Sequence, residues 1–275
     1  MNTSPCDISP DRSDLPVAAG FDSALRVGVT TGSTNGVNTV LKVSQYIESR
    51  NCGQLLYGTT NSKEVTVSFW VQSNLVGDVT VEMSSHNKNY IVSGVVNISA
   101  ANTWEYKTIT FPRNLNGGPL TSSAANIPGV GVTFYLGAGS DITDNDPNDN
   151  WVPLSGNGNT RVSSTNIQLS EGSSSYVRLA GVKMEIGGNA TPYEYQSYTT
   201  QLEECKRYFQ KGAYKEYWKG LSASAATGEH STLVNLFTEM RDVPSVSFAA
   251  ATGSVVSGIS EITKNSFVID FTSSS

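Results

Sequence analysis

The chain has 275 residues, 15% of them charged, and a formal net charge of −6 at pH 7. Soluble domains usually contain roughly 25% charged residues, and proteins that bind a phosphate backbone need clustered Lys and Arg, so this composition argues against a nucleic acid partner. No apolar run approaches the roughly 20 residues of a membrane span, so the sequence does not predict membrane insertion. The amino-terminal residues lack the pattern of a secretory signal, so it does not predict Sec-dependent export either.

Residues 1–20 contain prolines and short polar steps without hydrophobic periodicity. This pattern predicts an amino-terminal arm that either lies on another surface or is disordered. The three cysteines of the chain, Cys6, Cys52 and Cys205, are far apart in the sequence, which excludes a disulfide scaffold and a CxxC-type zinc site. Two interpretations remain open: one disulfide bond between two of these cysteines, or three free thiols without a function. We favour the free thiols.

Residues 21–196 are dominated by short segments in which apolar and polar side chains alternate. In "KEVTVSFWVQS" (63–73), for example, every second residue from 65 to 71 is Val or Phe, and Trp70 falls on the polar face. Such alternation is typical of a half-buried strand, and polar turns rather than helices separate the segments. The pattern predicts an all-β, jelly-roll β-sandwich. The predicted strands are 40–48, 63–73, 79–85, 90–99, 104–111, 130–138, 165–170 and 175–187.

The hydrophobic period changes to that of a helix over residues 197–211. Tyr198, Leu202, Cys205 and Phe209 recur at helical spacing and form one apolar stripe, while charged residues fill the opposite side. Ser197 or Thr199 can cap the start of this helix, and Gly212 can end it. A helix of about three turns does not persist alone in water, so we expect this connector to dock against a domain or against copies of itself.

Strand patterns return over residues 212–275, with alternating Val, Phe and Ile. They predict a small carboxy-terminal antiparallel β domain with a modest core. Neighbouring subunits would help to complete such a core.

Two tryptophans are candidate glycan-binding residues, because a sugar needs an aromatic face to stack on and a few polar groups for its hydroxyls. Trp70 lies on the polar face of its strand, and Trp151 lies in the loop "DPNDNWVPL". Burial is the alternative for each, and we favour it, because large aromatic side chains are mostly buried. Trp70 would then be covered by a loop or a subunit, and Trp151 would plug one end of the sandwich.

The loop "DITDNDPNDN" (141–150) is the densest group of carboxylates. Asp144, Asp146 and Asn148 match the first three ligand positions of an EF-hand loop, but Asp149 stands where Gly is required and Ser155 where Glu is required. The EF-hand interpretation therefore fails. A looser calcium site at Asp144 and Asp146 and an ordinary solvated turn both remain open, and calcium is the one cofactor that the sequence suggests.

The chain contains two histidines, His86 and His230, which offer no zinc motif and no catalytic pair. Two carboxylates facing each other across a groove would hydrolyse a glycan, but the sequence does not place any such pair. We therefore expect a protein that is not an enzyme.

The segment "LAGVKMEIGGNATPYEYQSYTTQLEECKRYF" (179–209) resembles a junction in bacteriophage tail-fibre and related virion surface proteins. In that family, the last strand of a jelly roll like those of carbohydrate-binding modules is followed by A-T-P-[FY]-E, a short helix and C-x-R-Y-[YF]. The residues that match in order and spacing are Glu185, Gly187, Ala190 to Pro192, Glu194, Cys205, Arg207 and Tyr208. "VTVSFWVQS" (65–73), "SQYIES" (44–49) and "FTEMRDVPSVSF" (237–248) resemble other parts of the same family, so the resemblance covers roughly residues 24–250.

The resemblance implies a homotrimeric phage virion protein, made in the host cytoplasm, that contacts host surface polysaccharide and other virion proteins. It also implies that the helix connects the jelly roll to the small domain, with its apolar stripe near a threefold axis. Two alternatives remain open: a capsid decoration or head-fibre protein that grips the shell through residues 1–20, and a polysaccharide depolymerase.

Overall fold

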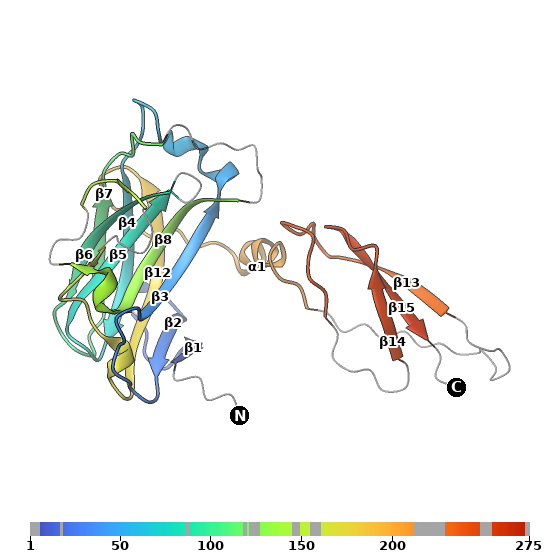
Figure 1. The fold of residues 1–275 in the computed structure, drawn as a ribbon, viewed down its shortest axis with the longest axis horizontal. Helices are drawn as coiled ribbons and strands as arrows, with labels where there is room; N and C mark the ends of the chain where they lie inside the picture. Colours follow the sequence, from blue (N-terminus) through green and yellow to red (C-terminus); the bar gives the residue numbers. More distant parts are fainter. Residues whose placement is uncertain are drawn as a thin grey trace. The chain divides into compact units, whose positions relative to one another are not determined.

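The computed structural model describes residues 6–16, 19–85, 89–117, 120, 127–144, 149–154, 161–211, 229–247 and 255–272. The chain divides into two compact units, Met1–Tyr193 and Glu194–Ser275 (Figure 1). The first unit is a β-sandwich, and the second contains one helix and a small sheet. This architecture confirms the predicted fold class.

Two five-stranded sheets form the sandwich. Sheet A has the strand order β1-β2-β12-β4-β7, and sheet B has the order β10-β6-β5-β8-β3. The strands of sheet A are β1 (Cys6–Asp11), β2 (Ala24–Val29), β12 (Ser175–Ile186), β4 (Val65–Ser73) and β7 (Glu105–Phe111). Those of sheet B are β10 (Val152–Pro153), β6 (Tyr90–Ile98), β5 (Gly77–Ser85), β8 (Pro128–Ala138) and β3 (Val40–Glu48).

The connectivity of the long strands is that of a jelly roll. Without the edge strands β1 and β10, sheet A pairs β2 with β12, β12 with β4 and β4 with β7, all antiparallel. Sheet B pairs β6 with β5, β5 with β8 and β8 with β3, also antiparallel. Strands that follow one another along the chain therefore lie mostly in opposite sheets, as two interleaved Greek keys require. The hairpin of β5 and β6 is the exception.

The sandwich core follows directly from the alternation in the sequence. In β4, Val65, Val67, Phe69 and Val71 are all fully buried and contact the inner residues of sheet B. The ring of Phe69 meets that of Phe134 of β8 edge to face, with centroids 4.9 Å apart. Each buried side chain of this size stabilises the fold by roughly 1.5–3 kcal/mol, so this interdigitated layer supplies most of the stability of the unit.

The strand predicted at residues 165–170 is wrong. Asn166 forms a single bridge to Asp78, and residues Leu169–Glu171 form a 3-10 turn, η6. The buried amide of Asn166 accepts a hydrogen bond from the backbone N–H of Thr80 and donates to the carbonyls of Tyr135 and Ile167. Asn side chains that bind the backbone in this way compete with a strand ladder, which explains the difference.

Part of the predicted arm is regular structure. Residues Cys6–Asp11 form β1, which pairs antiparallel with β2 at the edge of sheet A. Pro10 is tolerated there because an edge strand has one side free of ladder bonds. Residues 1–5 lie outside the described part of the chain.

The second unit contains α1 (Tyr198–Lys206) and a three-stranded antiparallel sheet in the order β13-β15-β14. The strands are β13 (Glu229–Asn235), β14 (Val255–Ser260) and β15 (Ser266–Thr272). Ser197 caps α1 by accepting a hydrogen bond from the N–H of Thr200 at 3.2 Å, as one of the two predicted caps. The helix ends at Lys206, so Phe209 and Gly212 lie beyond it. Residues 212–228, where another strand was predicted, lie outside the described residues.

No helix in the described part of the chain is both long and apolar enough to cross a membrane.

Candidate functional site on the outer face of sheet A

Trp70 lies on the outer face of sheet A, as the alternation of β4 predicts, and it is half-buried. Its partner across the ladder to β7 is Tyr106, which is 46% exposed. The two ring centroids are 5.4 Å apart, and the ring planes are tilted by 48°. The Trp70–Tyr106 pair is thus an accessible aromatic surface on a rigid sheet, which is the kind of surface on which a sugar ring stacks.

Polar side chains surround one end of this pair. We call Asp11, Asp14, Gln72, Trp104 and Arg178 the Asp14 cluster. Gln72 follows Trp70 on the same face of β4, Trp104 precedes β7, and Arg178 lies opposite Gln72 on β12. The two aspartates come from β1 and the segment after it. The amino-terminal segment therefore lies on the outer face of sheet A, beside the aromatic pair.

Hydrogen bonds and ion pairs connect the whole Asp14 cluster. The Nε of Arg178 donates to Oδ2 of Asp11 at 2.7 Å, and its Nη1 donates to Oε1 of Gln72 at 2.5 Å. The guanidinium of Arg178 also lies over the ring of Tyr176, 4.4 Å from its centroid. Hydrogen bonds from the side chain and backbone of Ser13, together with Arg178, lower the pKa of Asp11 to about 2. Asp11 is therefore ionised at neutral pH and pairs with the guanidinium of Arg178.

The other end of the same face is covered by the segment that follows β12. Thr66 donates a hydrogen bond to the carbonyl of Gly187 at 2.6 Å and shares another with Thr110. Over the middle of β12, the ring of Phe21 lies on Gly181 and meets the ring of Tyr193 edge to face, with centroids 5.2 Å apart. The segments before β2 and after β12 thus meet on this face of sheet A.

A turn between β6 and β7 holds Trp104 and Tyr106 in place. The carboxylate of Glu105 accepts hydrogen bonds from the N–H groups of Ser99 and Ala100 at 2.8 and 3.0 Å, and from Lys107 at 2.6 Å. Burial acts to raise the pKa of Glu105, but the hydrogen bonds from Lys107, Ala100 and Ser99 outweigh it and lower the pKa to about 2. Glu105 is a positioning residue for the two aromatic side chains on either side of it.

Trp151 is not an accessible aromatic, and the glycan-binding role suggested for it is wrong. Its side chain is only 7% exposed and belongs to the sandwich core. The indole Nε1 donates to the carbonyl of Pro112 at 2.8 Å, and the ring packs edge to face on Tyr57, with centroids 5.3 Å apart. The ring is packed and the indole N–H is hydrogen-bonded inside the protein, so Trp151 is a packing residue. This agrees with the interpretation that Trp151 is buried.

A second polar cluster lies on the outer face of sheet B, under the segment that contains Arg161. The hydroxyl of Tyr135 donates to Oε2 of Glu82 at 3.2 Å, and the Nε of Arg161 lies 3.3 Å from the same oxygen. Burial raises the pKa of Glu82, while the charge of Arg161 opposes this shift. Because Glu82 and Tyr135 are both buried, this cluster is sealed from a polymer. Tyr46, which lies against Gly131, is an exposed aromatic of this sheet.

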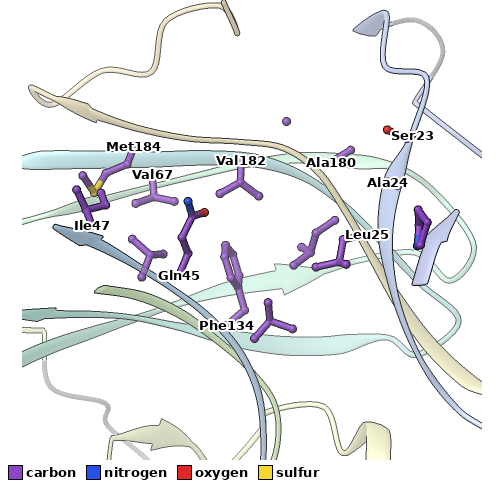
Figure 2. Close-up of a pocket in the computed structure, with 15 residues that line it drawn as sticks. Ser23, Ala24, Leu25, Gln45, Ile47, Val67, Phe134, Ala180, Val182 and Met184 are labelled. Carbon is purple, nitrogen blue, oxygen red and sulfur yellow. The ribbon is translucent and has the colours of Figure 1, made fainter. Parts of the chain in front are cut away.

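An apolar cleft of about 630 Å³ opens between the two sheets. Figure 2 shows the side chain of Gln45, from β3, extending toward Val182 of β12, with Phe134 below them. Aliphatic side chains make up most of the lining, so the cleft offers few hydrogen bonds to sugar hydroxyls and is a poor saccharide site. The lining residues are Pro10, Ser23, Ala24, Leu25, Val43, Gln45, Ile47, Val67, Val132, Phe134, Leu179, Ala180, Gly181, Val182 and Met184.

The two suggested calcium ligands, Asp144 and Asp146, lie at the edge of and within a part of the chain outside the described residues. Asp144 lies in the two-residue strand β9 (Thr143–Asp144), and its side chain is outside the described part, as is all of Asp146. Among the residues that the structure describes, no group of three or more His, Cys, Asp and Glu side chains could hold a metal ion. The three cysteines are free thiols.

The four residues of the predicted apolar stripe are all exposed among the residues that the structure describes. Tyr198 is 77% exposed and Phe209 is 72% exposed, while Leu202 and Cys205 are also exposed. No residue of α1 is buried.

Sequence reasoning missed Tyr106, Trp104 and Asp14. A signal existed for the first two, because alternation along residues 104–111 places Trp104, Tyr106, Thr108 and Thr110 on one face of a strand. No local signal connects Asp14 to Trp104, which lies 90 positions further along the chain.

No protein-family model matches the chain, and no curated protein matches it either. Among solved structures, it is similar to the enzymatically active domain of tailspike protein 4 of bacteriophage CBA120, with a TM-score of 0.38 and 12% identity over 68% of this chain and 18% of that one. It is also similar to TmCBM61 in complex with β-1,4-galactotriose, with a TM-score of 0.32 and 11% identity over 67% of this chain and 90% of that one. For a putative sugar binding protein from Bacteroides thetaiotaomicron, the TM-score is 0.36 and the identity 9%, over 68% and 85% of the two chains. Similarity at this level leaves the function to be argued from the residues of this chain.

Proposed function

We propose that the chain is a non-enzymatic glycan-binding protein of a phage virion, of the tail-fibre or receptor-binding type, and that it binds host surface polysaccharide on the outer face of sheet A. The observation that carries the binding part is the Trp70–Tyr106 pair, in which Tyr106 is exposed and Trp70 is half-buried, and which lies beside several hydrogen-bonding side chains on one sheet. Stacking supplies contact area, and the polar neighbours supply orientation.

The virion part of the proposal rests on the sequence. The junction at residues 179–209 resembles that of tail-fibre and related virion surface proteins. Assembly as a homotrimer agrees with the apolar side chains that α1 leaves exposed, because a second copy would cover them. Several copies on one particle would strengthen a site that is weak in a single chain.

The test is binding of the full chain to an array of bacterial polysaccharides, with Trp70→Ala and Tyr106→Ala as variants. We expect each variant to lose about tenfold in apparent affinity, since a stacking contact with an aromatic ring contributes on the order of 1 kcal/mol. Tyr46→Ala, which removes an exposed aromatic from sheet B, is the matched control and should bind like the wild type. Equal binding by Trp70→Ala and the wild type would contradict the proposed site.

The proposal of a binding protein is tested separately from that of a depolymerase. Incubation of the chain with each polysaccharide that it binds should release no reducing ends. Release that a single Asp or Glu substitution abolishes would replace the binding role by a hydrolytic one.

The alternative of a capsid-decorating protein requires a free amino-terminal arm. Residues 6–11 pair with β2, and Asp14 contacts sheet A, so this part of the arm is already engaged within the chain. The observation favours the glycan-binding proposal. Deletion of residues 1–20 should accordingly lower the stability of the sandwich, and loss of particle attachment in a chain of unchanged stability would favour the alternative.

A further inference from the structure

The carboxylate of Asp14 is held as a bound ligand would be. Oδ1 accepts a hydrogen bond from Nε1 of Trp104 at 3.3 Å. Oδ2 accepts one from Nε2 of Gln72 at 2.8 Å and one from Nη1 of Arg178 at 3.4 Å. Three donors from three different strands or their ends thus converge on the two oxygens of one carboxylate.

The donors are more deeply set than the group they bind. Gln72 is 1% exposed and the side chain of Arg178 is 11% exposed, whereas the side chain of Asp14 is 48% exposed. Asp14 also lies on a segment without regular secondary structure, after the end of β1. Gln72 and Arg178, which donate to this carboxylate, are thus set into the sheet, while the carboxylate of Asp14 lies at the surface.

The donors keep their positions through other contacts. Arg178 is paired with Asp11 and lies over the ring of Tyr176. Gln72 also donates to the carbonyl of Asn102 at 3.2 Å, and Tyr176 donates to the side chain of Asn102 at 2.6 Å. Since Asp11 still balances the charge of Arg178, removal of Asp14 would leave the three donors in place and able to bind another carboxylate.

This carboxylate position adjoins the proposed stacking surface. Gln72 is the next residue after Trp70 on the outer face of β4, and Trp104 is the residue before Tyr106 on the same face. Such neighbours are about 6.5–7 Å apart, a distance comparable to the size of one sugar ring. A sugar on the Trp70–Tyr106 pair would place a substituent, or the next sugar, close to Gln72 and Trp104.

We propose that the saccharide bound on this face is acidic, and that its carboxylate replaces that of Asp14 between Trp104, Gln72 and Arg178. This inference rests on the proposed function and deepens it by naming the class of polysaccharide, one that contains uronic or similar carboxylated sugars. Arg26, which also lies against the ring of Tyr176, adds positive charge at the same end of the face. In the free protein, Asp14 occupies the site and competes with the ligand.

The experiment compares the full-length wild type with Asp14→Ala on an array of uronate-containing polysaccharides, each printed beside its carboxyl-reduced form. We expect Asp14→Ala to bind the acidic forms about tenfold more tightly than the wild type, because the tethered competitor is gone, and to show no gain on the reduced forms. Asp22→Ala removes another exposed aspartate from the same segment and should show neither effect. Thermal unfolding of both variants checks that the sandwich is intact.

A second measurement examines the carboxylate position without any polysaccharide. The indole N–H resonance of Trp104 is followed while sodium galacturonate is added, with sodium chloride as the ionic control. It should shift in Asp14→Ala at lower concentrations than in the wild type. The assignment is made with Trp104→Phe.

The outcomes separate this inference from the proposed function. Equal binding of acidic and reduced forms, with no gain in Asp14→Ala, overturns the inference and leaves the stacking site standing. A galacturonate-dependent shift of Trp104 in Asp14→Ala, in a protein that binds no polysaccharide, supports the carboxylate site and contradicts the proposed function. The absence of both the shift and the gain shows that Asp14 only fastens the amino-terminal segment.

Discussion

At the scale of single residues, Glu105 decides how firmly the aromatic pair is presented. It lies between Trp104 and Tyr106 in the sequence and accepts hydrogen bonds from Ser99, Ala100 and Lys107. A carboxylate with this many donors is difficult to replace, because the N–H groups of the turn point at one place. The stability of the turn and the geometry of the site are therefore linked through one side chain.

We expect Glu105→Gln to lower the free energy of unfolding at pH 7 by about 1–2 kcal/mol, since it removes a charged acceptor. The pKa of Glu105 is about 2 in the folded protein, below its unfolded value, so the stabilisation is complete above pH ~4.5 and is lost as the pH falls toward 2. Urea unfolding of both proteins between pH 7 and pH 2 measures the difference. It should shrink with acid, and a constant difference down to pH 2 would show that ionisation of Glu105 is irrelevant. Asp22→Asn is the surface control.

The residue scale is also where sequence reasoning was least complete. Trp70 could be placed correctly because it alternates with Val67, Phe69 and Val71, which fixes its face. Trp151 lies in a loop without periodicity, so nothing local indicates that its indole reaches the carbonyl of Pro112. Contacts of this kind depend on tertiary structure and are not encoded in a window of neighbouring residues.

At the scale of elements, β12 carries the feature that organises the outer face of sheet A. Its pairing with β4 shifts by one residue between Ala180 and Lys183, which is a β-bulge. Inside the bulge, Gly181 has a φ of +57°, and the ring of Phe21 lies where a Cβ would be. The bulge explains why the inward residues change from odd numbers, such as Val177 and Leu179, to even numbers, such as Met184.

Gly181→Ala should lower the free energy of unfolding by roughly 2–4 kcal/mol, because alanine is strained at a left-handed φ and its methyl displaces Phe21. Gly53→Ala is the matched control: a Cβ there meets nothing within 4 Å, so a change within about 0.5 kcal/mol is expected. Denaturant unfolding of the full chain gives both values. The steric part is tested by adding Phe21→Ala, which should recover some of the loss. Additive effects of the two substitutions would exclude contact with Phe21 as a cause.

The elements themselves were largely predictable, and the exceptions have physical reasons. Seven of the eight predicted strands of the sandwich correspond to β3, β4, β5, β6, β7, β8 and β12, where alternation is long and regular. β1 and β2 were both missed. Pro10 and the acidic residues of "CDISPD" do not resemble a strand, and β1 is held by pairing with β2. The jelly-roll order of the strands follows from the fold class but could not be read from any single segment.

At the scale of the whole molecule, the two units differ in how completely they bury their apolar side chains. The sandwich contains a continuous core from both sheets. In the second unit, the buried apolar side chains among the described residues are Val234, Met240, Phe267 and Ile269. Large apolar residues of the same unit are exposed, including Tyr198, Phe209, Leu233 and Phe237. A unit with a core of this size needs additional burial to be stable, and association with further copies would supply it.

This imbalance leads to a prediction about the oligomeric state. The full chain should sediment as a homotrimer at micromolar concentration, with the second unit in the interface. Phe237 is 76% exposed, and its ring centroid lies 5.9 Å from the ammonium of Lys206 of α1. Phe237→Asp should place a charge in the predicted interface and reduce the sedimenting mass to that of a monomer. Val37→Asp changes a similarly exposed apolar residue of the sandwich and should leave the mass unchanged. A monomeric wild type would contradict the predicted trimer, because the exposed apolar side chains of the second unit would then have no partner in another copy. A trimer that Phe237→Asp leaves intact would show that the contact between copies lies elsewhere.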